Sequence, residues 1–298
     1  MSRRGWVLFA AMAVIWGIPY LLIKVAVAEI TPAALVFVRT ALGALLLLPL
    51  AMARGDIRPL FAHWKPVLAY TFVEVAGPWI LLFDAERKLS SSLAGLLVAG
   101  VPLVGSLFAW LVAGGERPDA RRVAGLVIGF VGVGLVVGLN VAADDALAVG
   151  EMALVVVGYA VGPMIIARRL SGVPTVGVVA ASIVLTALAY APLGIAQRPM
   201  ALPSVPVLLS VGILGAICTA LAFLLFFALI GEVGPIRATI ITYFNPAVAL
   251  LLGVVLLAEA FTVGIALGFA LIAAGSFVAT RRPAGMAATR NALSGGTP

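Results

Sequence analysis

Residues 93–138 read LAGLLVAGVPLVGSLFAWLVAGGERPDARRVAGLVIGFVGVGLVVG. An apolar run that contains Pro102 is followed by a turn with five charges between Glu116 and Arg122, and then by a Gly-rich apolar run. Each apolar run is close to the ~20 residues that a helix needs to cross a bilayer. The stretch therefore predicts two membrane-spanning helices joined by a short charged turn.

The same order of features returns near the C-terminus. Residues 238–279 read ATIITYFNPAVALLLGVVLLAEAFTVGIALGFALIAAGSFVA. Pro246 follows Pro102 by 246 − 102 = 144 positions, and Glu259 follows Glu116 by 259 − 116 = 143, so one residue deleted from the turn reconciles the two shifts. A repeat of roughly half the chain indicates a duplicated membrane unit.

The composition excludes most soluble functions. Hydrophobic residues make up 63% of the chain and charged residues 10%, whereas a soluble domain has about 25% charged residues. The net charge of +7 does not indicate nucleic acid binding, because the basic residues lie in short loops between apolar runs. With one cysteine and one histidine, the chain has no internal disulfide and almost no metal ligands, so we expect no metal and no cofactor.

Ten apolar runs have the length of a membrane span. They cover roughly 6–28, 33–53, 66–84, 91–113, 122–140, 151–169, 174–194, 206–230, 236–258 and 261–280. Five spans per half place the second half upside down in the membrane. The sequence therefore predicts an all-α integral membrane protein of two inverted five-helix repeats, residues 1–145 and 146–280, followed by a disordered tail, residues 281–298.

The distribution of Lys and Arg predicts the orientation. With the N-terminus in the cytoplasm, fourteen basic residues lie in cytoplasmic segments and three, Arg87, Lys88 and Arg198, lie outside. This bias is typical of inner-membrane proteins, and ten spans return the C-terminus to the cytoplasm. The first run is not a cleaved signal peptide, because it is too long and its repeat partner, 151–169, is internal.

A series of features resembles a known family. In chain order they are Trp16, Gly17 and Pro19 near the first helix, Arg39 in the second, and an apolar helix with Pro102 that ends at Glu116 before a Gly-rich helix. This pattern, largely repeated in the second half, resembles the EamA family of the drug/metabolite transporter superfamily. The resemblance implies ten helices in inverted repeats, a bacterial inner membrane location and export of small metabolites, including aromatic amino acids. The second copy has Ala160-Val161 in place of Trp16-Gly17, so the halves need not contribute equally to a substrate site.

Glu74 is the one acidic residue that we place well inside a span. A carboxylate at membrane depth is costly, so it indicates function by default. Glu74 lies one helical turn before Pro78, and both residues face the same side of their helix. Two interpretations stay open: a static pair with Arg39 or Lys24, or a group that takes a proton or the amino group of a substrate.

Prolines and aromatic residues within the spans complete the predicted site. Prolines bend or break helices, and breaks at matching depths in an inverted-repeat transporter point to the central site. Aromatic residues in spans more often belong to the core or the interface belt, and that alternative stays open for each of them. The predicted substrate-binding residues are Trp16, Tyr20, Glu74, Pro78, Trp79, Tyr159, Tyr243 and Asn245, with no catalytic residue.

We also expect a central, mostly apolar cavity lined by the first, third, fourth, sixth, eighth and ninth spans. Lys24 and Arg168, which are related by the repeat, are expected to snorkel to lipid headgroups, and binding of a carboxylate stays open as the alternative. The fifth and tenth spans should pack at the periphery through pairs of small residues. These pairs are Gly125/Gly129, Gly134/Gly138, Gly158/Gly162 and Gly264/Gly268.

These features favour a secondary transporter that exports amino acids with apolar or aromatic side chains by alternating access. An exporter of lipophilic cations is the closest alternative, because Glu74 could pair with a cation. An intramembrane enzyme would need a motif such as HExxH, and an ATP-driven pump would need GxxxxGK; neither occurs in the sequence. The expected partners are a small-molecule substrate, the lipid bilayer and, as a candidate coupling ion, protons; we expect a monomer.

Overall fold

The computed structural model describes residues 1–112 and 120–280, and every regular element in that part of the chain is a helix. The turn with Glu116 and the segment after Thr280 lie outside the described residues. Nine segments are long and apolar enough to cross a membrane, and a tenth apolar helix, Ile240–Leu256, is shorter. The expectation of ten full-length spans is therefore not met by the ninth run, because α13 (Pro235–Ala238) and the 3-10 helix η5 (Thr239–Tyr243) divide its first part.

The first half consists of α1 (Arg3–Ile15), α2 (Pro19–Ala26), α3 (Pro32–Ala53), η1 (Arg58–His63), α4 (Trp64–Tyr70), η2 (Thr71–Ala76), α5 (Gly77–Lys88), α6 (Ser91–Val98), α7 (Val101–Val112) and α8 (Ala120–Asn140). The second half consists of η3 (Ala143–Asp145), α9 (Ala146–Arg169), α10 (Thr175–Ala196), α11 (Val205–Gly215), η4 (Ala216–Leu221), α12 (Ala222–Val233), α13, η5, α14 (Asn245–Leu256) and α15 (Val263–Thr280).

The elements recur with the spacing of the sequence repeat. Both ends of α14 lie 144 residues after those of α7 (245 − 101 and 256 − 112), and α15 begins 143 residues after α8 (263 − 120). The π-helical segments η2 and η4 are related by 145 (216 − 71 and 221 − 76). A π-helical turn inserts an extra residue into an α-helix and often marks a functional site. The third and eighth spans therefore contain a π-helical turn at equivalent positions of the repeat.

The prolines act at helix starts more than inside helices. Pro102 and Pro246 are each the second residue of a helix that follows a break, and Pro19 opens α2 after α1 ends. The first turn is where a missing N–H is tolerated, because that group has no partner within the helix. Pro163, the repeat partner of Pro19, instead lies inside the continuous helix α9. The expected break therefore occurs in the first half and is absent from the matching span.

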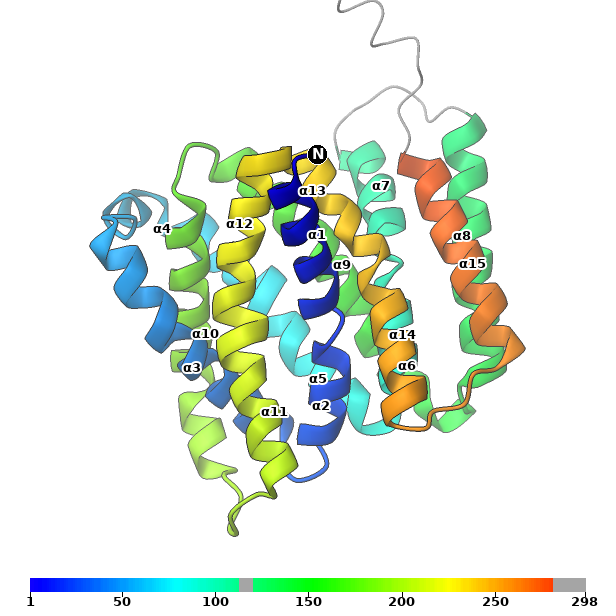
Figure 1. Ribbon diagram of the computed structural model, residues 1–298, viewed down its shortest axis with the longest axis horizontal. Coiled ribbons are helices and arrows are strands. Elements are labelled where there is room, and N and C mark those ends of the chain that lie inside the picture. The colour runs from blue at the N-terminus through cyan, green and yellow to red at the C-terminus, as the bar shows by residue number, and fades with distance from the viewer. Residues whose placement is uncertain (113–119, 281–298) are drawn as a thin grey trace, which may run out of the picture.

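Helices α8 and α15 lie side by side along one edge of the molecule (Figure 1). A Cβ atom added at Gly132 would lie 2.8 Å from Ile272 N and 2.9 Å from Gly268 O, so the two backbones are in direct contact. Gly134 and Gly138 have no atom within 4 Å of such a Cβ. The predicted small-residue packing is confirmed for Gly125, whose added Cβ would lie 2.8 Å from Gly275 O on α15, and it is wrong for the Gly134/Gly138 pair, which faces open space.

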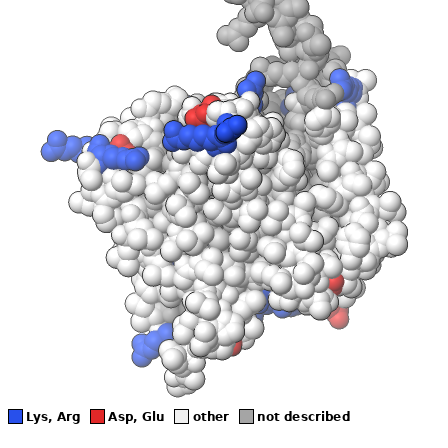
Figure 2. Space-filling view, in the orientation of Figure 1, with Lys and Arg blue, Asp and Glu red and all other residues white. Residues whose placement is uncertain are grey.

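The charges lie at the two ends of the helix bundle. Figure 2 shows most of the visible Lys and Arg residues at the end that holds the N-terminus, above a broad uncharged band. Large apolar side chains are exposed on the helices, among them Leu45 (70%), Phe72 (70%) and Leu147 (70%). Such an apolar surface is suited to lipid rather than water, and the chain is a multi-pass membrane protein. The opposite end, where the α14–α15 connection lies, is called the distal end below (Figure 1).

At the distal end, Glu29 ties two connections together. Its carboxylate accepts hydrogen bonds from Ser204 N at 2.7 Å and from Ser204 Oγ at 2.6 Å. These bonds lower the pKa of Glu29 from its ordinary value of 4.5. Because the native pKa is lowered, the stabilisation is present above the ordinary value and is lost as the pH falls through the native one.

We therefore expect wild type to melt at a higher temperature than Glu29→Gln at about pH 7, and this difference to be smaller at about pH 3. Thermal unfolding of the detergent-solubilised proteins across this range measures the difference. A difference that is the same at both pH values would contradict this account of Glu29.

Candidate functional site

Arg39 is a buried cation at the centre of the candidate site. The residue is 5% exposed, and its Nε donates to Thr219 Oγ1 at 3.0 Å. Its guanidinium carbon lies 3.7 Å from the centre of the Trp79 ring, a cation–π contact. Among the described residues, no carboxylate lies within 4.0 Å of the guanidinium. Arg39 is thus held in place through Nε and the ring, while the guanidinium has no carboxylate partner.

The two π-helical segments carry polar side chains at equivalent positions, and one of these side chains contacts Arg39. Thr219 belongs to η4, where its hydroxyl donates to Leu214 O at 2.8 Å, five residues back. This bond orients the Thr219 oxygen to accept from Arg39. Glu74 belongs to η2 and occupies the position equivalent to Thr219, since 219 − 74 = 145. The matching irregular turns therefore place a polar side chain at the same position of each segment.

Glu74 faces α9 without a partner. A side chain added at Gly162 would collide with Glu74 Oε2, and this buried oxygen has no hydrogen-bond partner in the described structure. Neither Arg39 nor Lys24 lies within 4.0 Å of the Glu74 carboxylate. The static ion pair, one of the two interpretations left open by the sequence, is therefore wrong. The alternative, a group that takes a proton or a substrate amino group, stays a prediction.

Aromatic side chains join the Arg39 and Glu74 regions. Tyr20, on α2, is 7% exposed and belongs to the same buried core as Trp79. Tyr159, on α9, packs against this core and lies between Gly158 and Gly162, which contact Pro78 and Glu74. The structure thus brings together Tyr20, Glu74, Trp79 and Tyr159 from the predicted set.

Pro78 holds α5 against α9. A Cβ atom added at Gly158 would lie 2.6 Å from Pro78 Cγ. Together with Gly162, this glycine lets α9 approach η2 and α5 closely. The Gly158/Gly162 pair therefore serves helix packing, as predicted, and in doing so it positions Glu74.

The other three predicted residues make contacts elsewhere. Trp16 packs on Phe226 with ring centres 4.7 Å apart. The Tyr243 hydroxyl lies 3.0 Å from Thr280 Oγ1, at the end of α15. In the amide orientation that satisfies both of its polar atoms, Asn245 donates from its amide nitrogen to Ala13 O at 3.2 Å and so links α14 to the end of α1. In this structure, these side chains connect helices and do not reach the Arg39 guanidinium.

Lys24 does not snorkel to headgroups. Its Nζ donates to Glu86 O at 2.7 Å and to Leu89 O at 2.8 Å. These are carbonyls at the C-terminal end of α5, where a helix lacks its own donors and a lysine is favourable. The expectation for Lys24 is therefore wrong, because carbonyls inside the protein are closer than the membrane surface.

Glu86 is the residue that the sequence reasoning missed. It is fully buried (0% exposed) and neither carboxylate oxygen has a hydrogen-bond partner in the described structure. We placed the end of the third span at residue 84, but α5 continues to Lys88. Glu86 lies seven residues, or two turns, after Trp79 and therefore on the same helix face. This spacing from Trp79 is the sequence signal that could have identified Glu86 as a site residue.

Glu259 caps a helix at the distal end. Its two carboxylate oxygens accept hydrogen bonds from Ser91 N at 2.7 Å and from Ser92 N at 2.9 Å, at the start of α6. A carboxylate at a helix N-terminus satisfies unpaired N–H groups and complements the helix dipole. This explains why the sequence places a glutamate after an apolar helix in this repeat.

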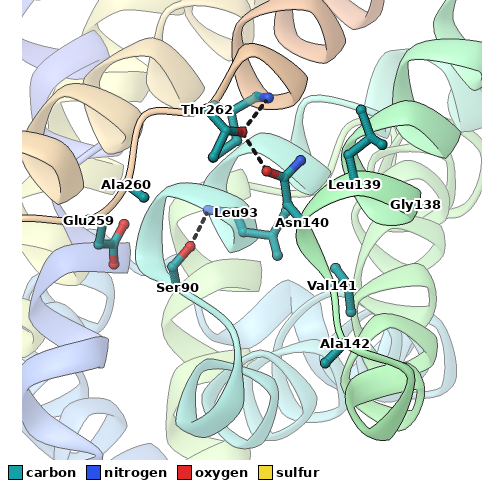
Figure 3. Close-up of a pocket in the computed structure, with 11 residues that line it drawn as sticks. Ser90, Leu93, Gly138, Leu139, Asn140, Val141, Ala142, Glu259, Ala260 and Thr262 are labelled. Atoms are coloured by element: carbon teal, nitrogen blue, oxygen red, sulfur yellow. Dashed lines mark hydrogen bonds between the residues drawn. The ribbon is translucent and has the colours of Figure 1, made fainter.

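A pocket of about 590 Å³ lies beside this cap. Figure 3 shows it between Ser90 and Leu93, the end of α8 at Asn140, and the connection that carries Glu259 and Thr262. A second pocket, of about 300 Å³, lies between α3, the end of α10 and α11. Neither is the predicted central cavity. The larger one borders α8 and α15, so the expected location is wrong for the pockets that the structure describes, because aromatic side chains fill the centre.

Comparison with known proteins places the chain in a family. The sequence profile of the EamA-like transporter family matches residues 3–138 and again residues 147–281. The chain belongs to the EamA-like transporter family. An uncharacterized transporter of Bacillus subtilis (strain 168), YvbV, is 28% identical over 135 residues, which are 45% of this chain and 44% of that protein. The chain thus matches less than half the length of this curated relative.

A solved structure supports the EamA-like fold over nearly the full length. The crystal structure of one protein matches with a TM-score of 0.67 and 26% identity, covering 94% of this chain and 98% of the other. Members of this family are transporters. The chain therefore has the fold of a transporter family. Two of its spans contain matching π-helical turns that carry polar residues.

Proposed function

We propose that this chain is a secondary transporter that exports amino acids with apolar or aromatic side chains across the bacterial inner membrane by alternating access. The observation that carries this proposal is the buried Arg39, which stacks on Trp79 and has no carboxylate within 4.0 Å among the described residues. A buried guanidinium without a carboxylate is costly and binds one readily, often through two parallel hydrogen bonds. The carboxylate of a substrate would complete the site.

The other half of a zwitterion has a candidate partner as well. Glu74 holds a buried oxygen without a hydrogen bond, and a substrate ammonium would satisfy it. Tyr159 packs against the core that contains Trp79, and it lies on α9 beside Gly162, the glycine that contacts Glu74. Trp79 and Tyr159 offer apolar surface to a ring, and such burial is worth roughly 25 cal/mol per Å².

Alternating access is supported by the repeat. The family profile matches twice, and the helix bounds recur with shifts of 143 to 145. The first half begins at the N-terminal end (Figure 1), whereas α8 ends beside the start of α15 at the distal end, where Asn140 and Thr262 are hydrogen bonded. We propose that residues 1–145 and 146–280 are inverted five-helix repeats, that the basic end faces the cytoplasm with both termini, and that the protein acts as a monomer.

Export of lipophilic cations is the second candidate. The unpartnered Glu74 favours it, because a buried carboxylate attracts a cation. Arg39 opposes it, because a like charge in a desolvated site repels the ligand. An amino acid satisfies both residues, and a lipophilic cation satisfies one.

The test is flux of radiolabelled phenylalanine and of a lipophilic cation into proteoliposomes that contain wild type, Glu74→Gln or Tyr159→Ala. We expect wild type to move phenylalanine. Glu74→Gln should lower that flux roughly tenfold or more, because a hydrogen bond to a charged group contributes about 1.5–3 kcal/mol. Tyr159→Ala should lower it to a similar extent through lost apolar contact. Cation flux that Glu74→Gln abolishes, with no phenylalanine flux in wild type, would establish the second candidate instead.

A further inference from the structure

A buried polar cluster at the distal end is not used by the proposed substrate site. Both carboxylate oxygens of Glu86 and the hydroxyl of Ser91 are buried without a hydrogen-bond partner in the described structure. The exposed fraction of each residue is 0%. Glu259 lies next to them, because it accepts a hydrogen bond from Ser91 N.

Charged and titratable groups face Glu86 from several elements. They are Lys24 and Tyr20 on α2, Arg39 on α3, Tyr159 on α9, and Glu259 in the α14–α15 connection. The positive charge of Lys24 favours a charge on Glu86, and the negative charge of Glu259 opposes it. Glu86 therefore lies between the Arg39 site and the distal cap.

The two carboxylates of the cluster, those of Glu259 and Glu86, differ in the hydrogen bonds that they accept. Glu259 accepts two backbone N–H groups at a helix N-terminus, an arrangement that stabilises its charge. The Glu86 carboxylate accepts no hydrogen bond from the part of the chain that the structure describes, and an ionised carboxylate buried in this way is strongly disfavoured. A proton on Glu86 removes this cost.

A metal ion is a poorer occupant than a proton. The carbonyls of Glu86 and Leu89, which could ligate a cation, already accept hydrogen bonds from Lys24 Nζ. In the described part of the chain, no group of three or more His, Cys, Asp or Glu residues could hold a metal ion. The positive charge of Lys24 would also repel a cation at this place.

The cluster lies where two helices close the distal end. The Ser92 hydroxyl donates to Leu250 O, on α14, at 3.4 Å. A Cβ atom added at Gly95, on α6, would lie 2.5 Å from Ala249 Cβ. Glu259, which follows α14, caps α6. Ser91 and Glu259, which lie near the buried Glu86, thus belong to this contact between α6 and α14.

We propose that Glu86 is a proton-binding site that locks this distal closure. Glu86 carries a proton while α6 and α14 are in contact, and it releases the proton to water when they separate. The closed form then binds one more proton than the open form, so a rise in pH favours opening by up to about tenfold per pH unit. The proposal does not depend on which solute is transported.

The experiment measures opening with a single cysteine reporter. Cys218 is the one cysteine of the chain, so Cys218→Ala provides a background for Leu93→Cys, at a position that is 3% exposed and lines the distal pocket. Maleimide labelling of the detergent-solubilised protein is followed from about pH 5.5 to 8.5. The rates are divided by those of Met200→Cys, an exposed position, to remove the pH dependence of the thiol.

We expect the normalised labelling rate to rise with pH, by up to about tenfold per unit. Adding Glu86→Gln, which mimics the protonated side chain, should keep the rate low at every pH. Asp84→Asn, two residues away at an exposed ion pair with Arg87, should leave the profile unchanged. A flat profile in the unmodified reporter, or the same rise with Glu86→Gln, would overturn the proposal. Glu86→Asp keeps a titratable group and should retain the rise, so a flat Glu86→Asp profile would overturn it as well, even if Glu86→Gln does not fold.

Discussion

Arg39→Gln is expected to lower phenylalanine flux in proteoliposomes by roughly 30-fold or more. The guanidinium is 5% exposed and lacks a carboxylate partner in the described structure, so in our account the substrate carboxylate is its partner. Removing one member of a buried hydrogen-bonded charge pair costs about 2–5 kcal/mol, and 1.4 kcal/mol is a factor of ten. The measurement is the initial rate of radiolabelled phenylalanine uptake at equal amounts of folded protein.

Two further variants separate recognition from charge and folding. Arg39→Lys keeps the positive charge but loses the planar fork that binds a carboxylate with two hydrogen bonds, so it should restore little of the flux. Arg54→Gln removes an exposed arginine at the end of the same helix, α3, and should transport as wild type does. Full phenylalanine flux in folded Arg39→Gln would show that Arg39 does not bind the substrate.

Gly132→Val is expected to destabilise the protein by about 1–3 kcal/mol. A Cβ atom at this position meets backbone atoms of α15 at 2.8 Å (Ile272 N) and 2.9 Å (Gly268 O). Backbone cannot move aside as the end of a flexible side chain can, so the two helices must separate. Thermal unfolding in detergent, with aggregation followed by size-exclusion chromatography, measures the loss.

Gly134→Val is the matched control on the same helix. The structure places no atom within 4 Å of a Cβ atom at Gly134, so the change should stay within about 0.5 kcal/mol of wild type. Equal losses for the two variants would mean that the effect arises from glycine in α8 in general and not from contact with α15.

The architecture could be predicted from the sequence because the repeat contains prolines and glycines, which have strong effects on local backbone structure and helix packing. Pro102 and Pro246 both start helices after breaks, and Gly132 marks a backbone contact. Hydropathy alone does not reveal where a glycine faces. Gly134 has the same spacing pattern as the packed glycines and still faces open space.

The site was predicted only in part, because its contacts join distant segments. The sequence reasoning selected Glu74, Trp79 and Tyr159 by type and depth. It did not match the π-helical turns, since no residue pattern announces them, and so it missed Thr219, which bonds to a residue 180 positions away. Glu86 was missed for a different reason: charged residues at the end of a run suggest the end of a span, but α5 continues past them.

The most direct test of the central claim compares three solutes in wild-type proteoliposomes: phenylalanine, 2-phenylethylamine, which lacks the carboxylate, and 3-phenylpropanoate, which lacks the ammonium. All three carry a phenyl ring on a short chain, so apolar burial is nearly constant and the charges decide the outcome. If Arg39 binds a carboxylate and Glu74 an ammonium, phenylalanine flux exceeds that of either analogue by roughly tenfold or more, since each lost charged contact contributes about 1.5–3 kcal/mol. Flux of 2-phenylethylamine equal to or above that of phenylalanine would contradict the claim.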